Sequence, residues 1–159
     1  MSGAGVPGPR TGEGFLVPAP LERPHLADTS VWAKAQRHPV LADWFNAEVR
    51  ALRIQTCDVV VLELLRSARN NAAFAHQAEL LDALDRCPLG TSEVAHARRV
   101  QVALAGRGQH RGVPPSDLLI AASAEAAGVP VLHHDHDYDL IAEVTGQPMR
   151  WISPAGSLP

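Results

Sequence analysis

Four aspartates stand at the ends of predicted strands or at the start of a predicted helix. Asp28 ends a first apolar strand, Asp117 lies in the first turn of a helix, and Asp135 and Asp137 directly follow a buried-type strand over 129–133. In an open parallel sheet, the loops and helix starts that bind ligands gather at the carboxyl ends of the strands. We therefore expect the four carboxylates at one edge of a sheet.

Converging carboxylates indicate a particular chemistry. They repel one another unless cations neutralise them, and hard oxygen ligands select Mg²⁺ or Mn²⁺. Two such ions about 4 Å apart can activate a water and stabilise the attacking and leaving oxygens of a phosphodiester displacement. The pattern predicts phosphodiester hydrolysis, with Asp28, Asp117 and Asp135 as catalytic residues that also bind metal together with Asp137.

A fifth acid, Glu63, lies in an apolar helical stretch, 59–65, that offers little polar surface. An unpaired buried carboxylate costs several kcal/mol or takes up a proton, so Glu63 needs a partner. A divalent cation would serve, and so would Arg66 three residues later. Glu63 joins the catalytic candidates, and Arg66, Thr29 and Ser30 are candidate substrate contacts.

Each acid also has a purely structural alternative. Asp117 could simply complement a helix dipole, and Asp28 could cap the helix that follows it. Asp135 and Asp137 could belong to a solvated turn, and Glu63 could be held by an arginine alone. The joint placement of the five acids favours the metal site.

Three histidines in the run His133 to Asp137 raise the alternative of a zinc site. Consecutive residues of a strand point to opposite faces, so they cannot all bind one ion. We expect His133 and His134 to flank the acidic site, and His136 to contact a substrate phosphate or nothing.

Short apolar strands alternate with helical patterns from residue 24 onward, which is typical of βαβ units and a parallel sheet. Ser116 is the expected N-cap of the helix that carries Asp117, and Gly128 and Gly146 are expected to end helices. The predicted strands are 25–29, 52–57, 129–133 and 149–152, and the predicted helices are 39–50, 58–68, 72–85, 91–105, 117–127 and 138–144.

The length of 159 residues fits one domain. Five glycines and four prolines among residues 1–20 oppose helix and strand, so we predict a disordered extension over 1–22, a domain over 23–152 and a tail over 153–159. No apolar run reaches the roughly 20 residues of a membrane helix, and no signal-peptide core is evident, which predicts a cytoplasmic chain without a membrane partner. Cys57 and Cys87 are expected to be reduced and buried.

A net charge of −3 argues against a broad positive surface for nucleic acid. Lys34 is the single lysine, so any basic contact must come from local arginines. The candidates for such contacts are Arg66, Arg69, Arg98, Arg99, Arg107 and Arg111.

Four segments in order, over about residues 24–152, resemble the VapC-type toxins of the PIN-domain ribonucleases. They are the sequences LADTSVW from Leu26, LELLR from Leu62, DLLIAA from Asp117 and LHHDHDYDLIA from Leu132. The resemblance implies a PIN-like three-layer α/β/α sandwich with a central, mostly parallel sheet. It also implies a Mg²⁺-dependent endoribonuclease, the toxin of a type II toxin-antitoxin system, with a cognate VapB-type antitoxin, a homodimeric state and tRNA or rRNA as substrate.

By motif, the resemblance carries Asp28 and Asp117 over as principal metal ligands, Glu63 as the helix-borne acid, and Asp135 and Asp137 as the C-terminal acidic pair. The alternative is a catalytically inactive PIN-like module that binds RNA or protein, and cleavage of DNA is a variant of the nuclease. A phosphoacceptor receiver domain is excluded because it needs a lysine near its last strands. A haloacid-dehalogenase phosphatase is excluded because its Asp-x-Asp pair stands on an early strand.

Overall fold

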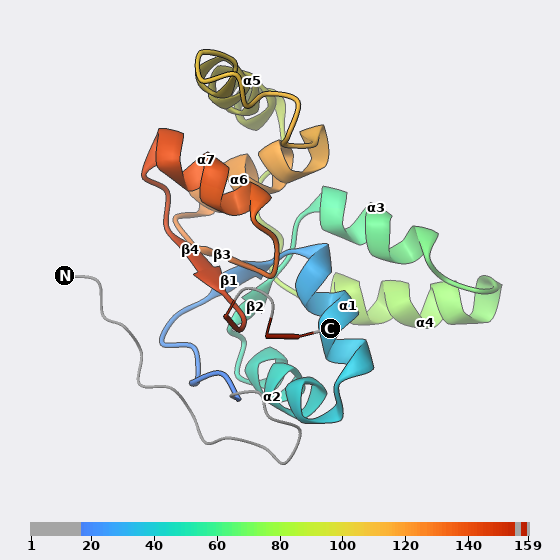
Figure 1. Cartoon of the computed structure of the whole chain (residues 1–159). Helices are drawn as coiled ribbons and strands as arrows, with labels where there is room; N and C mark the ends of the chain where they lie inside the picture. Colours follow the sequence, from blue (N-terminus) through green and yellow to red (C-terminus); the bar gives the residue numbers. More distant parts are fainter. Residues whose placement is uncertain (1–16, 155–156, 159) are drawn as a thin grey trace.

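A parallel sheet forms the centre of the chain in the computed structural model, which describes residues 17–154, 157 and 158 (Figure 1). The strands are β1 (His25–Ala27), β2 (Ile54–Gln55), β3 (Val131–His133) and β4 (Met149–Trp151), in the order β2-β1-β3-β4 with every pairing parallel. The two central strands, β1 and β3, therefore end side by side, just before the predicted acids.

Alternation along the central strands creates two apolar cores. Leu26 and Val131 belong to one core and Ala27 and Leu132 to the other, and all four side chains are fully buried. Helices α1 and α2 contribute to the second core, and the remaining helices contribute to the first. The predicted α/β/α architecture is thus confirmed. The helices are α1 (Thr29–Arg37), α2 (Pro39–Arg50), α3 (Asp58–Arg66), α4 (Asn71–Asp82), α5 (Thr91–Ala105), α6 (Pro115–Ala127) and α7 (Asp137–Thr145).

The bounds predicted for α2 and α5 are confirmed, as are Gly128 and Gly146 as left-handed ends of α6 and α7, with φ of 68° and 71°. The predicted N-cap of α6 is wrong. Pro114 occupies that position, because Pro115 has its φ fixed for the first helical turn and starts the helix before Ser116. The first strand is also shorter than predicted, since α1 begins at Thr29.

The segment 17–22 packs on the domain, although it was predicted to be part of the extension. Leu21 is 3% exposed in the second core, and its backbone N–H donates to the buried Glu48 carboxylate at 3.3 Å. Arg150 donates to the Ala19 carbonyl at 3.0 Å, and Leu158 of the predicted tail is also buried. Residues 1–16 lie outside the described residues.

The two thiols agree with the prediction of reduced, buried cysteines. Cys57 and Cys87 are both free and buried, and burial raises the pKa of Cys87 to about 12. Across the described part of the chain, no helix combines the length and the apolar character needed to cross a membrane.

Candidate metal centre

Three carboxylates converge beyond the carboxyl ends of the central strands. Asp117, Asp135 and Asp137 each offer an oxygen within 4.8 Å of the others, which makes them the one group of three or more metal-binding side chains among the described residues. The first turn of α6 supplies Asp117, the link from β3 to α7 supplies Asp135, and the first residue of α7 is Asp137. The backbone N–H of Asp137 donates to the Asp135 carboxylate at 3.0 Å, which fixes this link as a tight turn.

Asp117 carries the strongest electrostatic strain in the group. Burial raises the pKa of Asp117 to about 8, assisted by the charges of Asp28, Asp135 and Asp137. Burial and then the Asp135 charge also raise the pKa of Asp137, whose carboxylate accepts a hydrogen bond from the Asp117 carboxyl group. Without a cation, the cluster therefore holds a proton at neutral pH.

Asp28 lies beside the group and is already oriented by the protein. One of its oxygens accepts from the Ser30 backbone N–H at 3.0 Å and caps α1, and the other accepts from the Tyr138 hydroxyl at 2.7 Å. Tyr138 is fully buried, and this burial raises its pKa well above the usual value, so it remains a donor. The capping alternative for Asp28 thus holds together with its place at the acidic edge.

The hydrogen-bond partner of Glu63 is a hydroxyl group on another helix. Its carboxylate accepts a short hydrogen bond from the Thr29 hydroxyl, and no ion pair joins Glu63 to Arg66 within the described ranges. Glu63 is half-buried and lies outside the three-acid group, whereas Arg66 is exposed at the end of α3. Thr29 directly follows Asp28, so this hydrogen bond connects Glu63 to the neighbour of Asp28.

Ser30 is engaged within the protein. Its hydroxyl accepts from the His134 backbone N–H at 3.0 Å, which ties the start of α1 to the loop after β3. With Thr29 bonded to Glu63, both hydroxyls expected to contact substrate have protein partners. Their role in substrate binding stays a prediction.

The histidines surround a tryptophan and take no part in the acidic group, so the structure offers nothing for the zinc alternative in the part it describes. The His133 ring is fully buried and lies 5.0 Å from the Tyr138 ring and 4.9 Å from the Trp151 ring, measured between centroids. His134 and His136 also contact Trp151. Burial, and then the Lys34 ammonium, lower the pKa of His134.

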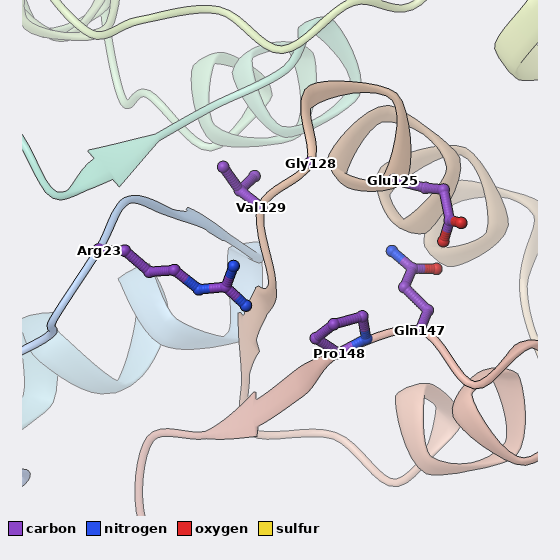
Figure 2. Close-up of a pocket in the computed structure, with 6 residues that line it drawn as sticks. All are labelled: Arg23, Glu125, Gly128, Val129, Gln147 and Pro148. Atoms are coloured by element: carbon purple, nitrogen blue, oxygen red, sulfur yellow. The ribbon is translucent and has the colours of Figure 1, made fainter. Parts of the chain in front are cut away.

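A separate pocket lies at the opposite edge of the sheet (Figure 2). It has a volume of about 140 Å³ and is lined by residues that precede β1, β3 and β4, together with the end of α6. Ligands in parallel sheets bind at the carboxyl edge, so we assign the chemistry to the acidic cluster. The lining residues are Arg23, Glu125, Gly128, Val129, Gln147 and Pro148.

Tyr138 and Trp151 are two residues beside the acidic cluster, at the carboxyl edge of the sheet, that the sequence analysis did not identify. Both contact partners far along the chain, Tyr138 reaching Asp28 across 110 positions. The available signal was chemical: a tyrosine or tryptophan in a buried stretch needs a partner for its polar atom, and the nearby acids are the obvious acceptors.

Comparison with known proteins agrees with the fold described above. Residues 26–144 match the family model described as PIN domain. Over 133 residues the chain is 43% identical to Ribonuclease VapC18 of Mycobacterium tuberculosis, and this alignment covers 82% of this chain and 96% of the relative. The chain is also 40% identical to Ribonuclease VapC51 of Mycobacterium tuberculosis, over 84% of this chain and 96% of that relative. A crystal structure of DNA-bound VapBC from Salmonella typhimurium has the same fold, with a TM-score of 0.61, 18% identity, and coverage of 82% of this chain and 98% of the other.

Proposed function

Because the chain belongs to the PIN-domain family of VapC-type ribonucleases, we propose that it is a Mg²⁺-dependent endoribonuclease, the toxin of a type II toxin-antitoxin system. The observation that carries the proposal is the position of Asp117. Burial, and then the charges of three neighbouring acids, raise the pKa of Asp117 to about 8, so its charged form needs a cation beside it. Hard carboxylate ligands suit Mg²⁺, and Mn²⁺ is the nearest substitute.

The acidic residues have separate roles in binding the metal. Asp117, Asp135 and Asp137, with Asp28 beside them, would hold the cation, and a cation bound there would supply charge neutralisation at the phosphate and an activated water. Asp28 keeps its direction because the Ser30 amide and the Tyr138 hydroxyl each hold one oxygen. The substrate is an RNA with single-stranded or loop regions, with tRNA and rRNA as the first candidates.

Glu63 approaches the site through Thr29, the neighbour of Asp28. We assign Glu63 to the catalytic set as a residue that orients the start of α1, and Arg66 on the same helix as a contact for a substrate phosphate. These two roles rest on position alone and are tested by the variants below.

A VapB-type antitoxin is the proposed protein partner, and a homodimer is the proposed form of the toxin. The structurally similar proteins described as VapBC complexes support the antitoxin partner. For the second, α4 has a single buried residue, Leu81, while Phe74 and Leu80 are 44% and 57% exposed. Exposed apolar side chains gathered on one helix are typical of protein interfaces.

The test is cleavage of total cellular RNA by the purified, antitoxin-free protein with Mg²⁺ or Mn²⁺, followed by mapping of the new ends. Asp28→Ala and Asp117→Asn should abolish cutting, as should EDTA. Asp43→Asn is the matched control, because it removes an exposed carboxylate on α2 by the same exchange.

Glu63→Gln and Arg66→Ala should lower the rate without abolishing metal binding. A folded, metal-loaded protein that cuts neither RNA nor single-stranded DNA would favour the alternative, an inactive PIN-like module that binds RNA or protein. Cutting of DNA alone would retain the nuclease and replace its substrate.

A further inference from the structure

A cluster of aromatic rings lies at the carboxyl ends of β3 and β4, next to the acidic group. Trp151, the last residue of β4, pairs in register with His133 of β3. The centroid of its ring lies 4.9 Å from that of His133, 5.3 Å from that of His134 and 5.0 Å from that of His136. Three imidazoles thus surround one indole at the carboxyl edge of the sheet.

The protein itself holds these rings in place. The Trp151 indole N–H donates to one oxygen of Asp139 at 2.9 Å, and Nδ1 of His136 lies 3.2 Å from the other. The His134 backbone is fixed by Ser30, and its ring lies 3.4 Å from the Ser153 hydroxyl. A ligand that meets the cluster finds ordered rings, so little conformational entropy is lost on binding.

The outer part of the cluster is open to solvent. The His136 side chain is 76% exposed, and His134 and Trp151 are half-buried, whereas His133 is fully buried beneath them. His133 therefore serves as the inner support. The other three rings form the accessible aromatic surface, which we call the ring platform.

The ring platform adjoins the acidic cluster through the chain itself. His136 stands between Asp135 and Asp137, whose mutual hydrogen bond fixes this turn. A phosphodiester that reaches the acids must carry its neighbouring nucleotide over the adjacent surface. The ring platform is that surface on the β4 side.

Electrostatics favour stacking over ion pairing as the source of affinity here. The chain has a net charge of −3, and three arginines of the described residues, Arg53, Arg86 and Arg107, already pair with carboxylates. Aromatic rings hold the bases of single-stranded RNA by stacking, which needs no positive charge and tolerates any base. Stacking on the ring platform would therefore add affinity without any further arginine or lysine.

We infer that His134, His136 and Trp151 form a stacking platform for the base next to the scissile phosphate of a single-stranded RNA, with Asp139 as the residue that positions two of the rings. This inference rests on the proposed ribonuclease function and deepens it. It assigns a substrate-binding role to residues that make no direct contribution to the metal site.

The test begins with a short single-stranded RNA that spans a cut mapped in total RNA. We expect Trp151→Ala and His136→Ala each to lower kcat/KM at least fivefold, or about 1 kcal/mol, mainly through KM. Trp151→Phe should retain more activity than Trp151→Ala. His110→Ala is the matched control, because it removes an exposed histidine from the turn after α5, and its kinetics should equal those of the unaltered protein.

A double-mutant cycle then separates stacking from a structural effect. Removing the base beside the cut, by an abasic nucleotide, should cost the unaltered protein several-fold and cost His136→Ala almost nothing more. Mn²⁺ affinity should be unchanged in His136→Ala. Additive losses in the cycle would overturn the proposed platform. Variants that cut normally but bind the antitoxin less tightly would also overturn it, because the surface would then bind the protein partner.

Failure of the proposed function is recognised separately, as the absence of any cutting by the unaltered protein. In that case, the probe is a random pool of 12-nucleotide single-stranded RNA in a filter-binding assay. Weaker retention by His136→Ala than by His110→Ala would keep the platform as an RNA-binding surface. Equal retention would overturn it.

Discussion

Replacing Asp117 by Asn should stabilise the metal-free protein, although it destroys the proposed metal site. The Asp117 carboxyl has a pKa of about 8 in the folded chain and an ordinary value of 3.8 when unfolded. Between these values the folded chain retains a proton that the unfolded chain has lost. Stability is therefore complete below about pH 4, falls as the pH rises, and levels off above about pH 8.

The magnitude follows from the same shift. Each pH unit inside this window costs about 1.4 kcal/mol, so the free energy of unfolding should fall by about 2.7 kcal/mol between pH 5 and pH 7 because of this one group. Asp117 is only 9% exposed, so solvent screening removes little of the effect. Asparagine has no charge to lose, and the Asp117→Asn variant should escape the decline.

The measurement is urea unfolding at pH 5, 6 and 7 in EDTA for both proteins, and the quantity compared is the difference in unfolding free energy at each pH. Subtraction cancels the titrations that the two proteins share. The difference should grow with pH in favour of Asp117→Asn, and added Mg²⁺ should reverse it, because the cation stabilises only the intact site. A flat or opposite trend for Asp117→Asn would refute the electrostatic account of the cluster.

Three further outcomes are expected. Binding of Mn²⁺ at pH 7 should release about one proton, because Asp117 must ionise to become a ligand, and calorimetry in buffers of different ionisation enthalpy measures that number; zero release would contradict the raised pKa. Tyr138→Phe should lower the free energy of unfolding by about 1–3 kcal/mol, since it leaves a buried Asp28 oxygen without its donor, and an unchanged value in urea would mean that water replaces the hydroxyl. Leu21→Ala should cost about 2–5 kcal/mol because the side chain is buried in the second core, whereas a loss near zero would place the segment 17–22 outside the folded domain.

The parts of the fold that local patterns determine could be predicted from the sequence. Helices α2 and α5 have clear apolar periodicity and distinct ends, and Gly128 and Gly146 mark helix ends because only glycine adopts that backbone conformation easily. The convergence of Asp117, Asp135 and Asp137 followed from the rule that parallel strands gather ligands at their carboxyl ends.

The parts of the fold and of the site that depend on contacts between distant segments could not be predicted from the sequence. Glu63 needed a partner, but nothing local identifies Thr29, which lies 34 positions earlier on another helix. The ring cluster depends on the pairing of β4 with β3, which brings Trp151 beside His133. Ser116 failed as a cap for a local reason, because two preceding prolines start the helix earlier than a serine cap requires.

Asp28 and Asp117 differ in what they contribute to the stability of the fold when no metal is bound. Asp28 caps a helix and accepts the hydroxyl of a buried tyrosine, so a descendant without nuclease activity would still be selected to keep it. Asp117 weakens the metal-free fold, and the same descendant would gain stability by replacing it. Among homologous sequences, the aspartate in the first turn of α6 is therefore the better marker of an active enzyme, and the aspartate that follows β1 marks mainly the fold.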